Sequence, residues 1–164
     1  MGEKIQRSGW WGPDFVSPFA YGEIPSDIIR PEIARLGRVP TRPTPTRHGS
    51  INLKEYTNSE GQSAYDRWQE LHGIVTVGGK TLKQDLETLI RSSRYRKMDD
   101  VGIDGKSSPR RAEISKRVET FRQHAYMRLL KEFPLLKRNE DIALYNRRQR
   151  AQGKPERQLI EIIK

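Results

Sequence analysis

The strongest constraint on the fold is a long segment between two prolines, Pro109 and Pro134, with the apolar spacing of a single helix. Ser108 is suited to cap its first turn, and Pro109 fits that turn because the N–H it lacks would be unpaired there. The stripe predicts a long amphipathic helix that packs against other elements along its length. Its apolar residues recur at spacings of three and four: Ile114, Val118, Phe121, Ala125 and Leu129.

Shorter helices are expected before this one. The first begins near Pro31, where the fixed φ of proline suits a first helical turn, and ends before Gly37. The second begins at Thr57 or Ser59 and ends at about His72, with Gln62 in the capping-box position relative to Ser59. One side of this second helix is apolar and aromatic and carries Tyr65, Trp68 and Leu71.

A third helix is expected between Thr81, a good N-terminal cap, and about Ser92. Leucines and an isoleucine recur in it at the helical period. The segment at 99–108, DDVGIDGKSS, then has the composition of a turn. Its carboxylates lack the alternating ligands and the final glutamate of a calcium loop, so no metal is expected there.

Two helical segments are expected after Pro134. Residues 137–154 predict a basic helix that stops at Gly153, because glycine commonly ends helices. The last ten residues, PERQLIEIIK, predict a short amphipathic helix. Its apolar face would consist of Leu159, Ile160 and Ile163.

Together these segments predict a mainly α protein: a small helical bundle with a long extended, proline-rich N-terminal arm and a basic C-terminal helix. The expected boundaries are 1–58 for the arm, which includes one short helix, 59–135 for the helical core, and 136–164 for the basic helix and tail. Only 34% of the 164 residues are apolar and 32% are charged, so the core is small. Part of the chain is therefore expected to become ordered only against partners.

The arm contains RLGRVPTRPTPTRHG at 35–49, which composition alone leaves open as a linker, a ligand for a proline-recognising domain, or a strap. Pro40, Pro43 and Pro45 fix φ and push the preceding residues out of the helical region, which favours polyproline II geometry. The segment stands between a helix end at Gly37 and the extended INL at 51–53. We interpret it as a preformed strap that lies on the helices or on a neighbouring subunit.

A tryptophan pair, Trp10 and Trp11, lies in the same arm. Tryptophan is enriched among the residues that dominate binding at interfaces. The pair therefore predicts an anchor into a neighbouring subunit. The alternative is that both side chains fold back on the protein's own helices.

The sequence contains no catalytic or metal-binding constellation. There is no cysteine, and His48, His72 and His124 lie far apart along the chain. The serines stand at cap and turn positions, and VGGK at 77–80 lacks the first glycine and the spacing of a phosphate loop. We expect a non-enzymatic protein without a cofactor, metal or small-molecule substrate.

Basic residues outnumber acidic ones, and the formal net charge is +10. This excess favours polyanionic partners, and the alternative is a solubilising surface excess. At the start of the long helix, positive charge opposes the helix dipole, which an anionic partner would offset. The candidates for sequence-independent contact with the phosphates of double-stranded DNA are Arg110, Arg111, Lys116, Arg117, Arg147, Arg148 and Arg150.

Six segments occur in an informative order: RLG at 35–37, a Pro-x-x-Pro strap at 39–43, INL at 51–53, YDRWQELHG at 65–73, TLKQDLETLI at 81–90 and FRQHAYMRLLKEFP at 121–134. This succession resembles the C-terminal region of the large internal virion proteins of tailed bacteriophages. The resemblance extends over roughly residues 31–136. It departs from the family pattern at TNSEGQS, residues 57–63, which intervenes between strand and helix.

The resemblance implies a structural virion protein, portal-associated or ejected with the genome, found in the virion and then in the host cell envelope. It implies portal or internal core proteins and further copies of the chain as partners, and it carries over no catalytic residue. The chain is expected to be a separate small virion protein or the terminal piece of a larger one. The alternative is a small basic DNA-binding accessory protein that acts in the cell. The expected interface residues are Trp10, Trp11, Leu36, Pro40, Pro43, Tyr65 and Trp68.

Overall fold

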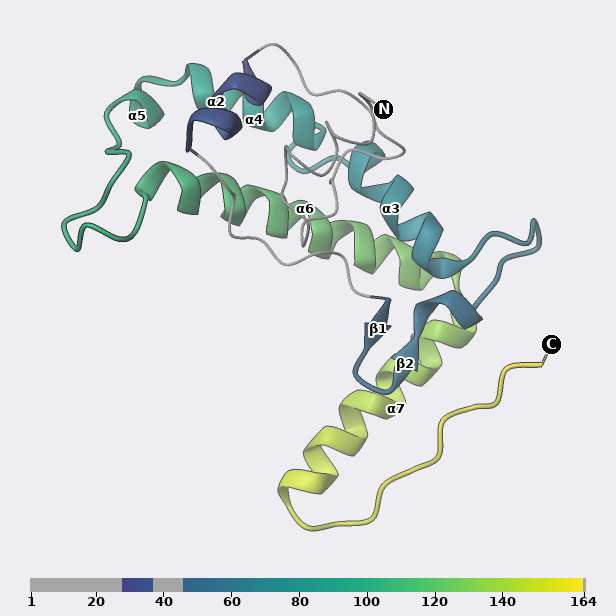
Figure 1. Ribbon diagram of the computed structural model, residues 1–164. Coiled ribbons are helices and arrows are strands. Elements are labelled where there is room, and N and C mark those ends of the chain that lie inside the picture. Colours follow the sequence, from purple (N-terminus) through teal and green to yellow (C-terminus); the bar gives the residue numbers. More distant parts are fainter. Residues whose placement is uncertain (1–27, 37–45, 164) are drawn as a thin grey trace, which may run out of the picture. The chain divides into compact units, whose positions relative to one another are not determined.

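The computed structural model describes residues 28–36 and 46–163, and it confirms the mainly α fold class (Figure 1). The chain forms two compact units. The described part of the first unit comprises residues 28–36 and Gln69–Ala125, and that of the second comprises residues 46–68 and 126–163. Helices α3 (Ala64–Ile74) and α6 (Pro109–Glu132) contribute residues to both units.

The first unit packs short helices around the first part of α6. Helix α2 (Ile29–Leu36) packs against α4 (Leu82–Arg91), which is followed at once by the single turn α5 (Ser93–Arg96). Apolar side chains from each of these helices are buried in this core. They include Ile33, Leu36, Leu86, Tyr95, Ile114 and Phe121.

The second unit is built around α7 (Pro134–Ala151). A two-stranded hairpin, β1 (Arg47–His48) and β2 (Ile51–Asn52), pairs His48 with Ile51 and leads into the 3₁₀ turn Leu53–Glu55. After α7 the chain is extended and runs back beside this helix (Figure 1). The core of this unit consists of Ile51, Leu53, Tyr56, Trp68, Leu129, Phe133 and Leu136.

Local sequence signals account for most helix ends. Thr81 and Gln84 form a reciprocal capping box at the start of α4, and the Ser108 hydroxyl accepts the N–H of Arg111 at the start of α6. Pro134 has no N–H to continue the ladder of α6, so the chain breaks at Phe133 and α7 begins. The caps at Thr81 and Ser108 and the end of α6 before Pro134 agree with the sequence-based expectations, whereas α7 begins three residues before the expected residue 137.

The end of α7 is fixed by Gly153, whose φ of 66° lies in the left-handed region. The N–H of Lys154 donates to the carbonyl of Gln149, and the N–H of Gly153 donates to the carbonyl of Arg150. This pair of bonds is the Schellman motif, in which glycine at the left-handed position satisfies the last carbonyls of a helix. The predicted stop at Gly153 is therefore confirmed.

Two local expectations are wrong. Helix α3 begins at Ala64 rather than near Ser59, because the Asn58 side chain accepts the N–H groups of Glu60 and Gln62 in a tight turn. Ser63 then supplies the cap through its hydroxyl. The C-terminal residues are also extended rather than helical, for reasons that concern α7 and are given below.

Among the described residues, no helix is both long and apolar enough to cross a bilayer.

Candidate functional site

The candidate site is the side of α7 on which residues 154–163, here called the tail, lie. Asn146 forms two hydrogen bonds with one tail residue: its Nδ2 donates to the carbonyl of Arg157 at 2.7 Å, and its Oδ1 accepts the N–H of Arg157 at 2.7 Å. Asn139 repeats this pattern with Ile160, at 3.0 Å and 2.7 Å. We call Asn139 and Asn146 the asparagine pair. Each amide satisfies both main-chain groups of one tail residue.

The spacing of these contacts follows from the geometry of the two segments. Seven residues separate the asparagine pair, a rise of about 10.5 Å along an α-helix. Three residues separate Arg157 from Ile160, a span of about 10 Å in an extended chain. The match lets both amides engage the tail at once, with the tail running antiparallel to α7.

Asn139 is the more deeply placed member of the pair, with 1% of its surface exposed. Its Nδ2 also donates to the Tyr56 hydroxyl at 2.8 Å, so both amide hydrogens are used. Burial raises the pKa of Tyr56, against the smaller opposing effect of this hydrogen bond. A buried amide without hydrogen-bond partners is strongly destabilising. The main-chain groups of the tail supply such partners and so offset the cost of burying Asn139.

Directly after this asparagine on α7, Glu140 gathers a second polar cluster within the same unit. Its Oε1 accepts the Tyr126 hydroxyl and is 2.7 Å from Nδ1 of His48. The hydrogen bond to Glu140 raises the pKa of His48, which favours the imidazolium form. Burial and the same carboxylate raise the pKa of Tyr126, whose ring also packs against Trp68 at 4.9 Å between centroids. The cluster ties the hairpin and α6 to α7.

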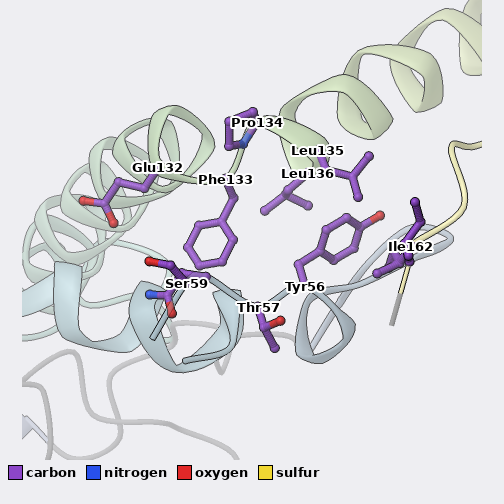
Figure 2. Close-up of a pocket in the computed structure, with 11 residues that line it drawn as sticks. Tyr56, Thr57, Ser59, Glu132, Phe133, Pro134, Leu135, Leu136 and Ile162 are labelled. Carbon is purple, nitrogen blue, oxygen red and sulfur yellow. The ribbon is translucent and has the colours of Figure 1, made fainter. Parts of the chain in front are cut away.

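A pocket of about 370 Å³ opens at the start of α7 (Figure 2). Its floor is apolar, with Phe133 and Leu136 pointing inward, and its rim carries Ser59 and Glu132. The tail closes one side through Ile162 and Ile163. The lining combines these apolar side chains with polar ones, which include Thr57 and Asn58.

Basic residues crowd the last turns of α7 and the start of the tail. Arg147 and Arg148 are exposed, and no ion pair of either occurs within the described part of the chain. Arg150 pairs with Glu156 at 2.6 Å, and the Arg157 guanidinium stacks over Tyr145 at 4.3 Å. Cations here complement the negative end of the helix dipole. Of the predicted DNA-contacting residues in this region, Arg147 and Arg148 are the most available.

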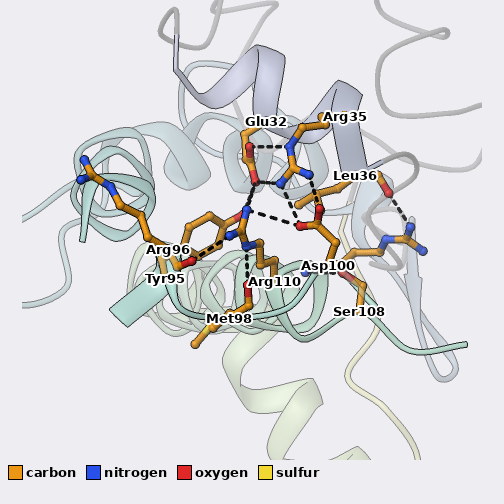
Figure 3. A network of polar contacts seen from close by, with 10 residues as sticks. Glu32, Arg35, Leu36, Tyr95, Arg96, Met98, Asp100, Ser108 and Arg110 are labelled. Carbon is orange, nitrogen blue, oxygen red and sulfur yellow. Dashed lines mark hydrogen bonds and ion pairs between the residues drawn. The ribbon is translucent and has the colours of Figure 1, made fainter. Parts of the chain in front are cut away.

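The predicted basic cluster at the start of α6 lies in the first unit and is used differently (Figure 3). Arg110 donates to the carbonyls of Met98 and Arg96 at 2.8 Å and 3.0 Å. It also lies 3.3 Å from a carboxylate oxygen of Asp100 and 3.7 Å from one of Glu32. The anionic partner that the helix dipole argument called for is therefore present inside the chain.

Of the three neighbouring DNA-contact candidates, two form contacts within the unit and one is exposed. Arg111 donates to the carbonyl of Leu36, the last residue of α2, and Arg117 forms a two-pronged contact with Asp85 at 2.9 Å to each oxygen. Lys116 is exposed. DNA contact by this cluster stays a prediction, and the internal contacts already give its arginines a structural role.

The carboxylates of the same network are held in their ionised form. Burial by itself would raise the pKa of Glu32, but hydrogen bonds from Arg35 and Tyr95 outweigh burial and lower it. The hydrogen bond from Arg35 lowers the pKa of Asp100. Tyr95 donates to Glu32 at 2.7 Å, and burial together with this contact raises its own pKa. The network fastens α2 to α5 and the start of α6.

The predicted protein-interface residues fall in three places. Leu36 and Trp68 are buried in the described structure, and Tyr65 is half-buried with Lys54 over its ring at 5.3 Å. Trp10, Trp11, Pro40 and Pro43 lie outside the described residues, as does most of the expected strap. Burial within a unit gives Leu36 and Trp68 a packing role.

Among the described residues, no group of three or more histidine, aspartate or glutamate side chains is placed to hold a metal ion. His72 is buried, and burial followed by the charge of Arg122 lowers its pKa to about 3. It is therefore neutral near pH 7. His48 and His72 are held in structural surroundings, and His124 is exposed.

No protein-family model, curated protein or solved structure gives a significant match to this chain.

Sequence reasoning missed the asparagine pair. A signal was present: two asparagines seven residues apart on one helix, a glycine stop seven residues later, and a short tail with room to return. Asparagine has a low helix propensity. Two asparagines on one side of a helix therefore indicate that their side chains bind another group. The groups that bind these asparagines are main-chain groups of the tail, and the pattern of side chains in the sequence does not identify them.

Proposed function

We propose that this protein is a non-enzymatic structural component of an oligomeric assembly, acting through contacts between protein chains. The observation that carries the proposal is the tail held on α7 by the asparagine pair, since this is a device for seating an extended segment on a helix. Main-chain hydrogen bonds are a recurrent means by which proteins bind extended segments.

The setting that we propose is the virion of a tailed phage, where the protein is portal-associated or ejected with the genome and reaches the host cell envelope. The support for this setting is the ordered resemblance of the sequence to internal virion proteins. Portal or internal core proteins and further copies of this chain are the proposed partners. The low apolar share of 34% fits a protein that completes its packing in an assembly.

Light scattering coupled to size exclusion tests the assembly proposal on the full chain. We expect oligomers whose fraction rises with protein concentration, and mass spectrometry of purified virions is expected to detect the chain. A monomer at every concentration, together with its absence from virions, would contradict the proposal.

A second candidate is a small basic DNA-binding accessory protein that acts in the cell. It is favoured by the exposed Arg147 and Arg148. If both contact phosphates, replacing both with alanine should reduce the slope of log K against log salt by about 2.

Gel-shift titration at two salt concentrations measures this slope. The matched control replaces two other exposed cations, Arg91 and Lys106, with alanine. Equal losses in the two double variants would point to general charge attraction, and absence of binding by the parent chain would remove this second candidate.

A further inference from the structure

We infer that α7 is a docking site for the tail of a second copy of this chain, so that tails are exchanged between subunits. This inference deepens the proposed assembly function and rests on it. The juxtaposition that carries it is the asparagine pair bonded to the main chain of Arg157 and Ile160.

The contacts that hold the tail are mostly independent of its side chains. The four hydrogen bonds of the asparagine pair reach N–H and carbonyl groups, which every tail presents in the same form. Most tail side chains are exposed, and Ile163 retains 95% of its surface. Because few apolar contacts are lost when the tail leaves, its release from its own α7 is easier than the release of a buried segment.

The positions of the contacts along the tail indicate that the segment bound to α7 is a tail of this chain. Beyond Ile160 the tail reaches the pocket at the start of α7, where Ile162 and Ile163 belong to the lining together with Phe133 and Leu136. The pocket thus lies beside the apolar end of the tail. A second copy of the same tail satisfies the two asparagines and the pocket with no change in the α7 surface.

The connection between α7 and the tail is suited to exchange. Gly153 adopts a left-handed φ and Pro155 follows two residues later, so the direction of the tail is set by a few backbone angles. Reorienting this hinge sends the tail to another subunit while each contact is kept. Exchange of an identical element is a low-cost route to oligomers because the closed contacts are the same in both forms.

Charge also favours a tail as the occupant. The end of α7 is strongly basic, and the tail places Glu156 against Arg150 at 2.6 Å. The tail continues with Glu161 among apolar residues. The tail also carries Lys154 and Arg157, so its two acidic residues keep it near neutral overall, and Glu156 is the group that meets the basic helix end.

The absence of cysteine permits a direct test with the full chain. Two single-cysteine variants are made, Arg150→Cys on α7 and Glu156→Cys on the tail, at positions whose side chains contact each other. They are mixed at high concentration and treated with a short bismaleimide. A chain with both substitutions reports the unexchanged contact by an internal crosslink.

Exchange predicts a covalent heterodimer in the mixture, absent when either variant is treated alone at the same concentration. Adding Asn146→Ala to the Arg150→Cys chain should reduce the heterodimer several-fold. Adding Gln149→Ala, a neighbouring change on the same helix whose side chain takes no described hydrogen bond, should leave the yield unchanged. Circular dichroism of each variant checks that α7 is folded.

Internal crosslinking of the double variant without heterodimer in the mixture would overturn the inference, as would a heterodimer insensitive to Asn146→Ala. Failure of both crosslinks would show that the tail does not lie on α7, and would overturn it too. Light scattering on the same samples separates the two proposals. Oligomers without heterodimer crosslinks reject tail exchange and leave the assembly function standing, whereas monomers reject both.

Discussion

Each unit of the molecule docks a short peripheral segment on a helical face, and the two units do so by opposite chemistry. In the first unit, α2 presents buried Ile33 and Leu36 together with the charged Glu32 and Arg35. In the second, the tail presents main-chain groups to the asparagine pair. Docking through side chains depends on the sequence of the docked segment. Docking through the main chain tolerates sequence change and suits exchange.

The predicted DNA-contacting arginines also differ from one another in their contacts. Arg110, Arg111 and Arg117 in the first unit meet carboxylates or carbonyls of the same unit. Arg147 and Arg148 at the end of α7 have no such contacts among the described residues. The first set stabilises a fold, and the second leaves positive charge available to a partner.

The largest expected effect separates the two docked segments by their burial. Ile33→Ala removes a fully buried side chain of α2 and should lower the free energy of unfolding by about 2–5 kcal/mol. Ile160→Ala changes a tail side chain that is 40% exposed and should lower it by less than about 1 kcal/mol. Urea denaturation measures both. Similar losses of unfolding free energy in the two variants would contradict the difference between the two docked segments.

A second prediction concerns pH and the buried His72 of the first unit. Its pKa of about 3 is below the ordinary value, so the unfolded state takes up a proton more readily. Stability from this group is present above about pH 6.5 and is lost as the pH falls towards 3, by an amount on the order of a few kcal/mol. His72→Gln should flatten the dependence of unfolding free energy on pH in this window. An unchanged slope would contradict the assignment.

A third prediction concerns Asn139. Asn139→Ala leaves the Tyr56 hydroxyl and the main-chain groups of Ile160 without this partner, and should destabilise by about 1–3 kcal/mol despite the better helix propensity of alanine. Gln149→Ala on the same helix should change stability by less than about 0.5 kcal/mol. Thermal unfolding of the two variants compares them directly. Equal stabilities would mean that the asparagine contributes nothing to holding the tail.

The smallest effect is expected from His48 in the second unit, and it has the opposite sign to that of His72. The hydrogen bond to Glu140 raises the pKa of His48, so its contribution is present below about pH 6.5 and is lost as the pH rises through the raised pKa. The side chain is 45% exposed, and solvent screening keeps the contribution below about 1 kcal/mol. His48→Gln should remove this decline, as measured by denaturation between pH 6 and 8.

Local signals in the sequence were sufficient for most helices. Thr81, Ser108 and Pro109 each act on groups within four residues, so their effect could be predicted without knowing the fold. The start of α3 was missed because the side chain of Asn58 competes for the same local N–H groups. Both outcomes concern contacts near in sequence, where residue type carries most of the information.

The candidate site depended on distant contacts and was not predicted. Leu159, Ile160 and Ile163 have helical spacing, yet the tail is extended because its main-chain groups pair with asparagines 11 and 21 positions away. Arg110 and Arg111 had the composition of a phosphate-binding cluster, but Asp100 and the end of α2 reach them in the fold. The net charge predicted that some basic side chains form no ion pair. Only the structure showed that, within its described residues, Arg147 and Arg148 are of this kind.

Amide hydrogen exchange of the tail in the full chain tests the central claim most directly. Within the described residues, Arg157 and Ile160 are the positions after Lys154 whose N–H groups are hydrogen-bonded. Exchange should be at least about tenfold slower at these two positions than at Gln158 and Leu159, and the protection of Arg157 should be lost in Asn146→Ala. Equally fast exchange at all four positions in the parent chain would contradict it.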